Sequence, residues 1–256
     1  MPKPPGARPR RPQTRTPTDR STKRPPLTPQ VTTLWDYPSQ HYGPGVQGDP
    51  NYKGATPSYV IWNLLHRYTR PKGLVIDPFC GSGTTLDVAR DLGRRALGYD
   101  VHPYRPDIFR RDARDLPLED AKADFVFMDP PYSTHLDYGE DTRDIGKLSA
   151  ASGDYYNAMD AAFAEAWRVL KPGGHLGVYV SDSYVHKGLD KGFHPIGVVL
   201  FGSLLRAGWE PVEHVAVTRH NKTLAMGNYR KAADEGNFFL RGFNHLLVVR
   251  KPENKG

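Results

Sequence analysis

This 256-residue chain has little of several features that would place it in a specialised class of protein. Its single cysteine, Cys80, excludes a disulfide framework and a cysteine-based zinc site. No apolar run approaches the ~20 residues needed to cross a membrane. The basic residues near the N-terminus are not followed by the apolar segment of a secretory signal. We therefore expect a soluble, cytoplasmic protein with no membrane partner.

Residues 1–30 contain almost no large apolar side chains. They hold nine of the 24 prolines and eight basic residues against one acid, Asp19. Their charge of +7 equals the net charge of the whole chain, so the remaining residues are balanced. Such a segment cannot bury enough apolar surface to offset the entropy lost on ordering. We expect a disordered tail, which is either a polycationic arm that neutralises phosphates or a solubilising linker.

Residues 31–254 have the pattern of one globular domain. Short apolar runs predict strands at 74–76, 96–99, 125–128, 176–180, 212–217 and 245–249. Apolar residues at helical spacing predict helices over 60–68, 84–92, 159–170 and 196–207, and the first should begin at Thr56 as N-cap. Lys171–Gly174 predicts a turn. Alternating strands and helices indicate an α/β fold with helices on both faces of a sheet.

A glycine-rich loop stands between the first predicted strand and the helix after it. It reads Asp77, Pro78, Phe79, Cys80, Gly81, Ser82, Gly83, Thr84 and Thr85. Glycines let the backbone approach a ligand, and the N–H groups of the helix N-terminus favour a carboxylate or a phosphate. Asp100 ends the next strand, about twenty residues on, where a carboxylate can accept hydrogen bonds from ribose hydroxyls. The pattern favours an adenosine-type cofactor, with a ligand-free tight turn as the alternative.

A second motif, Asp129, Pro130, Pro131 and Tyr132, follows another buried strand. The Asp129 carboxylate and the Pro130 carbonyl would accept hydrogen bonds from an amino group. Two such acceptors align the nitrogen lone pair for attack on a methyl carbon. Tyr132 offers a flat face on which a base can stack. The alternative is a proline-rich turn with a surface tyrosine.

The two motifs together resemble those of the DNA amino-methyltransferases, the N6-adenine and N4-cytosine family. The resemblance extends to Gly93–Asp100 and to Arg168–Gly174, and it covers roughly residues 35–250. It implies a class I methyltransferase fold, with a doubly wound, mostly parallel sheet of seven strands and an antiparallel C-terminal strand. Many relatives with this cofactor motif carry the second motif first, whereas here the order is reversed.

The resemblance also implies roles for individual residues. S-adenosylmethionine would be the cofactor, and no metal is implied. The residues expected to bind it are Asp77, Pro78, Phe79, Gly81, Ser82, Gly83, Thr84, Asp100, Asp112 and Ala113. The second motif, Asp129–Tyr132, would hold a base rotated out of the DNA duplex.

The sequence therefore predicts a site-specific DNA methyltransferase acting on an exocyclic amino nitrogen, with adenine N6 slightly favoured over cytosine N4. Segments 133–156 and 218–243 are candidates for DNA contact. A restriction endonuclease is a candidate partner, and the sequence indicates no oligomeric state. Two alternatives stay open. One is an RNA guanine-N2 methyltransferase, which uses a similar tetrapeptide, and the other is a non-catalytic nucleic-acid-binding module.

Overall fold

The computed structural model describes residues 27–37, 39–52, 54–132, 141–185, 191–219, 224 and 226–253. Most of the predicted tail, residues 1–26, lies outside the described residues. So do residues 133–140, 220–223 and 225 of the two candidate DNA-contacting segments. No helix in the described ranges is both long and apolar enough to span a bilayer.

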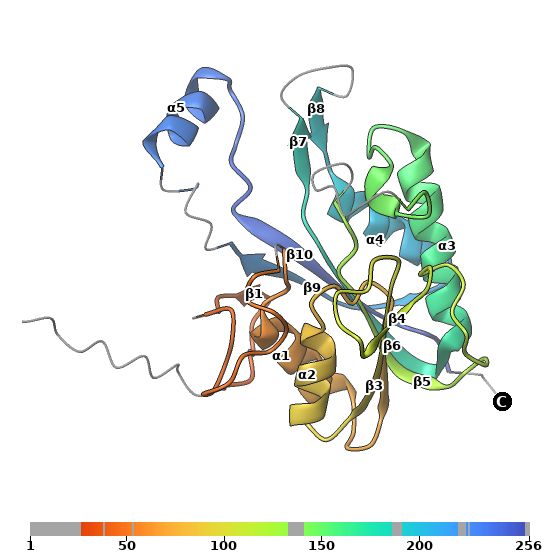
Figure 1. Cartoon of the computed structure of the whole chain (residues 1–256). Helices are drawn as coiled ribbons and strands as arrows, with labels where there is room; N and C mark the ends of the chain where they lie inside the picture. The colour runs from red at the N-terminus through yellow and green to blue at the C-terminus, as the bar shows by residue number, and fades with distance from the viewer. Residues whose placement is uncertain are drawn as a thin grey trace, which may run out of the picture.

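One eight-stranded sheet lies at the centre of the fold (Figure 1). Its strands, in spatial order, are β1 (Leu34–Trp35), β9 (Glu210–Thr218), β10 (Phe243–Arg250), β6 (Leu170–Val180), β5 (Ala123–Met128), β2 (Leu74–Asp77), β3 (Arg95–Asp100) and β4 (Ile108–Arg110). Only the two pairings of β10, with β6 and with β9, are antiparallel. The predicted α/β architecture with an antiparallel C-terminal strand is confirmed. The predicted strand number was one short, because the two-residue β1 is too brief to give a periodic signal.

Helices cover both faces of this sheet (Figure 1). The helices α1 (Ser58–Tyr68) and α2 (Thr84–Asp91) contribute to one apolar core, and α3 (Gly153–Val169) and α4 (Ile196–Arg206) contribute to the other. Strand β5 divides its side chains between the two cores: Phe125 and Phe127 join the first, and Val126 and Met128 join the second. All four are essentially inaccessible to solvent, as expected for a strand buried on both faces.

Several short elements lie outside the central sheet. The strands β7 (Ser183–Val185) and β8 (Gly192–His194) pair with one another, and α5 (Gly227–Glu235) lies between β9 and β10 in the chain. Figure 1 shows both units projecting beyond the same end of the sheet. A single turn of 3₁₀ helix, η1 (Ile145–Lys147), follows the tetrapeptide motif. None of these was predicted, because each is short or largely polar.

Two local predictions were wrong. Thr56 does not cap α1, because the helix begins at Ser58 after Pro57 and has no side-chain cap. The hydroxyl of Thr56 instead donates a hydrogen bond to Asp129. Lys171–Gly174 is not a separate turn but the beginning of β6. There the backbone N–H of the left-handed Gly173 (φ +77°) donates to the Lys251 carbonyl, and the Lys251 N–H donates to the Gly174 carbonyl. Pairing with the chain after β10 thus keeps this bend within the strand.

The strand order places the two sequence motifs beside each other. Strands β2 and β5 are parallel neighbours, and the glycine-rich loop follows β2 while the tetrapeptide follows β5. After β2 the chain continues towards β3 and β4, whereas after β5 it continues towards β6 on the other side. The loops diverge at such a switch point and leave a crevice, which is where doubly wound sheets bind ligands.

Gly98 provides a test of how closely β3 packs against the glycine-rich loop. It pairs with Asp77 of β2, and a Cβ built on it would lie 2.4 Å from the Cys80 sulfur. Gly98→Ala should therefore lower the free energy of unfolding by about 1–3 kcal/mol, the usual cost of overpacking a core. Urea denaturation measures this. Adding Cys80→Ala removes the clashing sulfur and should recover part of the loss; a double variant no more stable than Gly98→Ala would contradict the packing argument.

Candidate active site

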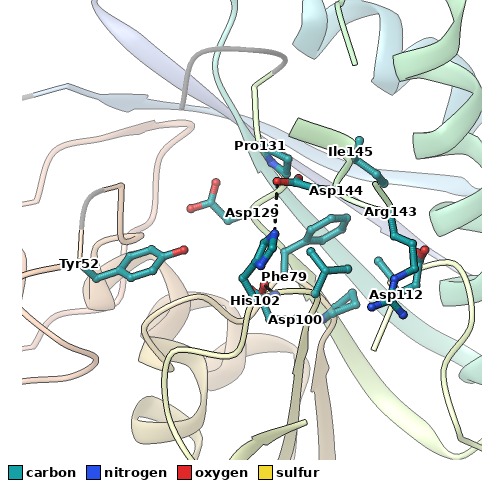
Figure 2. A pocket seen from close by; sticks show the side chains of 13 residues that line it. Tyr52, Phe79, Asp100, His102, Asp112, Asp129, Pro131, Arg143, Asp144 and Ile145 are labelled. Atoms are coloured by element: carbon teal, nitrogen blue, oxygen red, sulfur yellow. Dashed lines mark hydrogen bonds and ion pairs between the residues drawn. The ribbon is translucent and has the colours of Figure 1, made fainter. Parts of the chain in front are cut away.

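Two neighbouring cavities at the carboxyl ends of β2, β3 and β5 contain most of the predicted site residues. The larger, about 510 Å³, is lined by Pro78, Phe79, Asp100, Asp112, Ala113, Asp129 and Pro131 among others. The smaller, about 350 Å³, is lined by Asp77, Phe79, Gly81, Ser82, Thr84 and Asp129 among others. Phe79, Asp129 and Tyr52 border both cavities, so the glycine-rich loop and the tetrapeptide open onto the same space (Figure 2).

Three predicted residues do not line either cavity. Gly83 is the left-handed N-cap of α2 (φ +81°). A Cβ built on it would lie 2.6 Å from the Arg105 guanidinium. Pro130 is buried within the tetrapeptide. Tyr132 is turned towards Asp129, to which its hydroxyl donates a hydrogen bond of 2.8 Å.

The two acids at the ends of β2 and β3 hold the backbone of the glycine-rich loop. Asp77 accepts the Phe79 N–H at 3.0 Å and the Thr85 hydroxyl at 2.5 Å. Asp100 accepts the Gly81 N–H at 2.8 Å and, on its other oxygen, the His102 N–H at 2.8 Å. Each carboxylate oxygen can accept more than one hydrogen bond, so both acids keep acceptor capacity towards the cavities.

Three carboxyl groups face these cavities in surroundings that disfavour charge. Burial raises the pKa of Asp77 to about 7, and hydrogen bonds from Thr85 and Phe79 offset only part of the effect. Burial likewise raises the pKa of Asp129 to about 7 against hydrogen bonds from Thr56 and Tyr132. The pKa of Asp100 is also raised, mainly by burial. Because Asp129 and Asp100 each raise the pKa of Asp77 further, a bound cation would stabilise all three ionised groups.

Side chains from three elements hold the tetrapeptide in place. Thr56, from the loop before α1, donates to one oxygen of Asp129, and Tyr132 donates to the other. Tyr155, fully buried in α3, donates its hydroxyl to the Pro131 carbonyl at 3.0 Å. Sequence reasoning missed Thr56 and Tyr155. Thr56 lies 73 residues from Asp129, so no local spacing could have indicated their contact.

Asp112, predicted to reach an adenine ring, is held by Arg114. The Arg114 side chain donates to both carboxylate oxygens, at 2.9 and 2.7 Å. Burial alone would raise the pKa of Asp112, but the hydrogen bonds from Arg114 outweigh it and hold the pKa below its usual range. Arg114 also donates to the Arg143 carbonyl at 3.0 Å, which ties this wall to the segment after the tetrapeptide.

The far side of the tetrapeptide meets one candidate DNA-contacting segment. Arg219 directly follows β9 and interacts electrostatically with Tyr132 and Tyr179. Its guanidinium donates to the Ser181 hydroxyl at 3.0 Å, just after β6. Segment 218–243 therefore begins within reach of Tyr132. In the described part of the chain, no cluster of three or more His, Cys, Asp or Glu side chains is arranged to hold a metal ion.

The sequence also matches known methyltransferases. A family described as "DNA methylase", the N6 and N4 methyltransferases, matches residues 4–111, and one described as "Methyltransferase domain" matches residues 76–178. The relatives include the type II methyltransferase M.MjaII of Methanocaldococcus jannaschii, 36% identical over 59 residues (23% of this chain), and M1.MboII of Moraxella bovis, 33% identical over 72 residues (27% of this chain). The chain is thus similar to the DNA methylase family over its first 111 residues and to short stretches of type II methyltransferases.

The chain's matched part spans 11% of the length of the first of these methylases and 28% of the second. Among solved structures, the cyclase SpnF shares the fold with a TM-score of 0.51 and 20% identity, over 81% of this chain and 88% of the other. That likeness concerns the fold alone, because one fold supports many reactions. The match to a methyltransferase domain supports S-adenosylmethionine as the cofactor.

The chemistry of the site fits this cofactor. The larger cavity is bordered by Asp100, a hydrogen-bond acceptor suited to ribose. The smaller cavity meets the glycine-rich loop just before α2 begins. A Cβ on the left-handed Gly81 (φ +45°) would lie 3.0 Å from the ring of Tyr52, which borders this cavity. The carboxyl groups of Asp77 and Asp129 supply the negative charge that a sulfonium cation requires.

The raised pKa of Asp77 predicts a specific dependence of stability on pH. A folded-state pKa above the unfolded value of 3.8 means that the folded protein binds more protons between about pH 4 and pH 7. The contribution of Asp77 to the free energy of unfolding is therefore complete below about pH 4 and falls as pH rises to about 7. Asp77→Asn removes this titration, so its unfolding free energy should decline less between pH 5 and pH 8 than that of the wild type. Urea denaturation across this range measures both; parallel curves would contradict the assignment.

Proposed function

We propose that this methylase transfers the methyl group of S-adenosylmethionine to an exocyclic amino nitrogen of a base in DNA. The observation that carries the proposal is that Gly81, of the glycine-rich loop, and Asp129, of the tetrapeptide, line one cavity. Similarity to type II methyltransferases supports DNA as the substrate. The Asp-Pro-Pro-Tyr form of the tetrapeptide favours adenine N6 over cytosine N4.

Each wall of the crevice binds a different portion of the cofactor. Asp77, Pro78, Phe79, Gly81, Ser82, Gly83 and Thr84 surround its methionine half. Asp100 holds the ribose, and Asp112 and Ala113 hold the adenine. When bound, the cofactor supplies an electrophilic methyl group on a sulfonium sulfur. The chain's contribution is chiefly to position the two reactants and to keep water out, which can account for a large part of a rate enhancement.

The tetrapeptide binds the target base. The ionised Asp129 carboxylate accepts one amino N–H, and the Pro130 carbonyl accepts the other. Since the hydroxyl groups of Thr56 and Tyr132 already donate to the two oxygens of Asp129, the amino group uses the remaining lone pairs. Asp129, with a pKa of about 7, is also suited to receive the proton that the methylated nitrogen must lose. The aromatic face of Tyr132 stacks on the base.

DNA binding involves surfaces beyond the crevice. Residues 31–254 form the methyltransferase domain, and the basic tail of residues 1–30 neutralises phosphates without sequence preference. Segments 133–156 and 218–243 contact the duplex around the everted base. Arg219 supports this assignment for the second segment because it interacts with Tyr132 of the tetrapeptide. A restriction endonuclease that cuts the unmethylated sequence is the candidate partner.

Replacement of Asp129 tests the proposed reaction. Asp129→Ala should abolish methyl transfer, because it removes the acceptor for the target amine. It should retain binding of S-adenosylhomocysteine, which carries no sulfonium charge, because the glycine-rich loop stays intact. The measurement is incubation with tritiated S-adenosylmethionine and either DNA or RNA, followed by nucleoside analysis. Glu213→Ala, at an exposed position of β9 outside both proposed DNA-contacting segments, is the control for charge. Undiminished product from Asp129→Ala would overturn the assignment, and labelled N2-methylguanosine in RNA would replace DNA with RNA as the substrate.

The hydrogen bond from Thr56 predicts a shift in the pH profile of methyl transfer. Transfer requires ionised Asp129, so the rate should rise with pH through about 7. Thr56→Val removes a donor that lowers the pKa of Asp129, and the midpoint of the rise should move up by about 1 pH unit. Thr56→Ser keeps the hydroxyl and should retain the wild-type midpoint. Identical midpoints for valine and threonine at position 56 would refute the role of this bond.

A further inference from the structure

Two buried polar atoms face one another at the larger cavity without a hydrogen-bond partner. They are Nε2 of His102 and Oδ2 of Asp144, and they lie 3.9 Å apart (Figure 2). Asp144 is only 5% exposed, and both residues line the cavity. Neither atom belongs to any residue that the sequence motifs assign to the site.

Each residue is fixed by its other polar groups. The backbone N–H of His102 donates a hydrogen bond to Asp100, the acid expected to hold the ribose. The Oδ1 atom of Asp144 accepts the Gly146 N–H at 2.7 Å and so caps η1 after the tetrapeptide. The unpartnered atoms therefore come from two loops, one after β3 and one after β5, that are held independently on either side of the cavity.

The separation of these atoms suits one intervening oxygen. At 3.9 Å they are too far apart for a direct hydrogen bond, yet a single oxygen can lie about 2.8 Å from both. Ionised Asp144 can only accept a hydrogen bond there, and His102 donates when Nε2 carries the proton. The geometry therefore calls for a group that both accepts and donates, such as a hydroxyl. Buried polar atoms without partners destabilise the folded protein, and such a ligand would remove that cost.

We propose that His102 and Asp144 together bind one ribose hydroxyl of the cofactor, next to Asp100. Both oxygens of Asp100 already accept a backbone N–H, from Gly81 and His102, so fewer lone pairs remain for two hydroxyls. The His102–Asp144 pair supplies the second set of partners. This inference rests on the proposed function only in that the cofactor carries a ribose, and its test requires neither DNA nor methyl transfer.

Calorimetric titration of the full-length protein tests the pair. The ligands are S-adenosylhomocysteine and its 2′-deoxy and 3′-deoxy analogues, and the variants are Asp144→Asn and His102→Leu. Asparagine keeps the Oδ1 cap on Gly146 but replaces the Oδ2 acceptor with a donor. In the wild type, loss of the contacted hydroxyl should weaken binding about tenfold, which corresponds to 1.4 kcal/mol. In either variant S-adenosylhomocysteine should bind more weakly than in the wild type. The deoxy analogue that lacks the contacted hydroxyl should then bind the variant almost as well as S-adenosylhomocysteine does.

The control is Glu213→Gln, which makes the same change of charge on an exposed side chain of β9 away from the cavity. It should retain the wild-type affinities for all three ligands. If both deoxy analogues lose as much affinity in the two test variants as in the wild type, the His102–Asp144 site is wrong and the proposed methylation is unaffected. If the wild type binds none of the ligands, the site and the cofactor assignment fall together.

Discussion

The parallel pairing of β2 with β5 is the constraint on which the rest of this structure depends. Val75 and Ile76 of β2 pair with Phe125 and Val126 of β5, and all four side chains are completely buried. Because the two strands run in the same direction, the loops that follow them leave the sheet at the same edge. The chain then continues in opposite directions, so nothing in the main chain fills the space between them. Two motifs separated by about fifty residues of sequence thus meet at one crevice.

This arrangement gathers negative charge in a place that does not favour it. Asp77 and Asp129, at the ends of the two strands, each have a pKa raised to about 7 by burial. The folded protein therefore sacrifices some stability at neutral pH to keep these groups in position, a common cost at functional sites. In the proposed site, a sulfonium cofactor would offset that cost on binding, because it would bring a positive charge to the carboxylates. The same two groups would then favour the charged methyl donor over uncharged compounds of similar shape.

The site residues that the sequence predicted are marked by local spacing along the chain, whereas those that it missed are brought to the site by tertiary contacts. Asp77, Gly81 and Asp100 follow apolar runs at fixed spacing, so strand ends and glycines indicated them directly. Thr56 and Tyr52 come from a loop without periodicity and reach the site only through tertiary packing. The Thr-Pro-Ser sequence at the start of α1 fits an N-cap equally well, and only the distant contact with Asp129 decides between the two roles. His102 and Asp144 are isolated polar residues in loops, for which residue type alone favours a solvated surface.

The placement of α5 has a consequence for how such a protein can diversify. The segment that contains α5 leaves the sheet after β9 and re-enters it at β10. These two strands are antiparallel neighbours. Its two ends are thus fixed next to each other, and lengthening or replacing it changes the entropy of loop closure only slowly. The crevice is formed by strands on the other side of β6 and does not include this excursion. If the segment between β9 and β10 contacts DNA as proposed, its exchange would change the sequence preference and leave the chemistry between β2 and β5 unaltered.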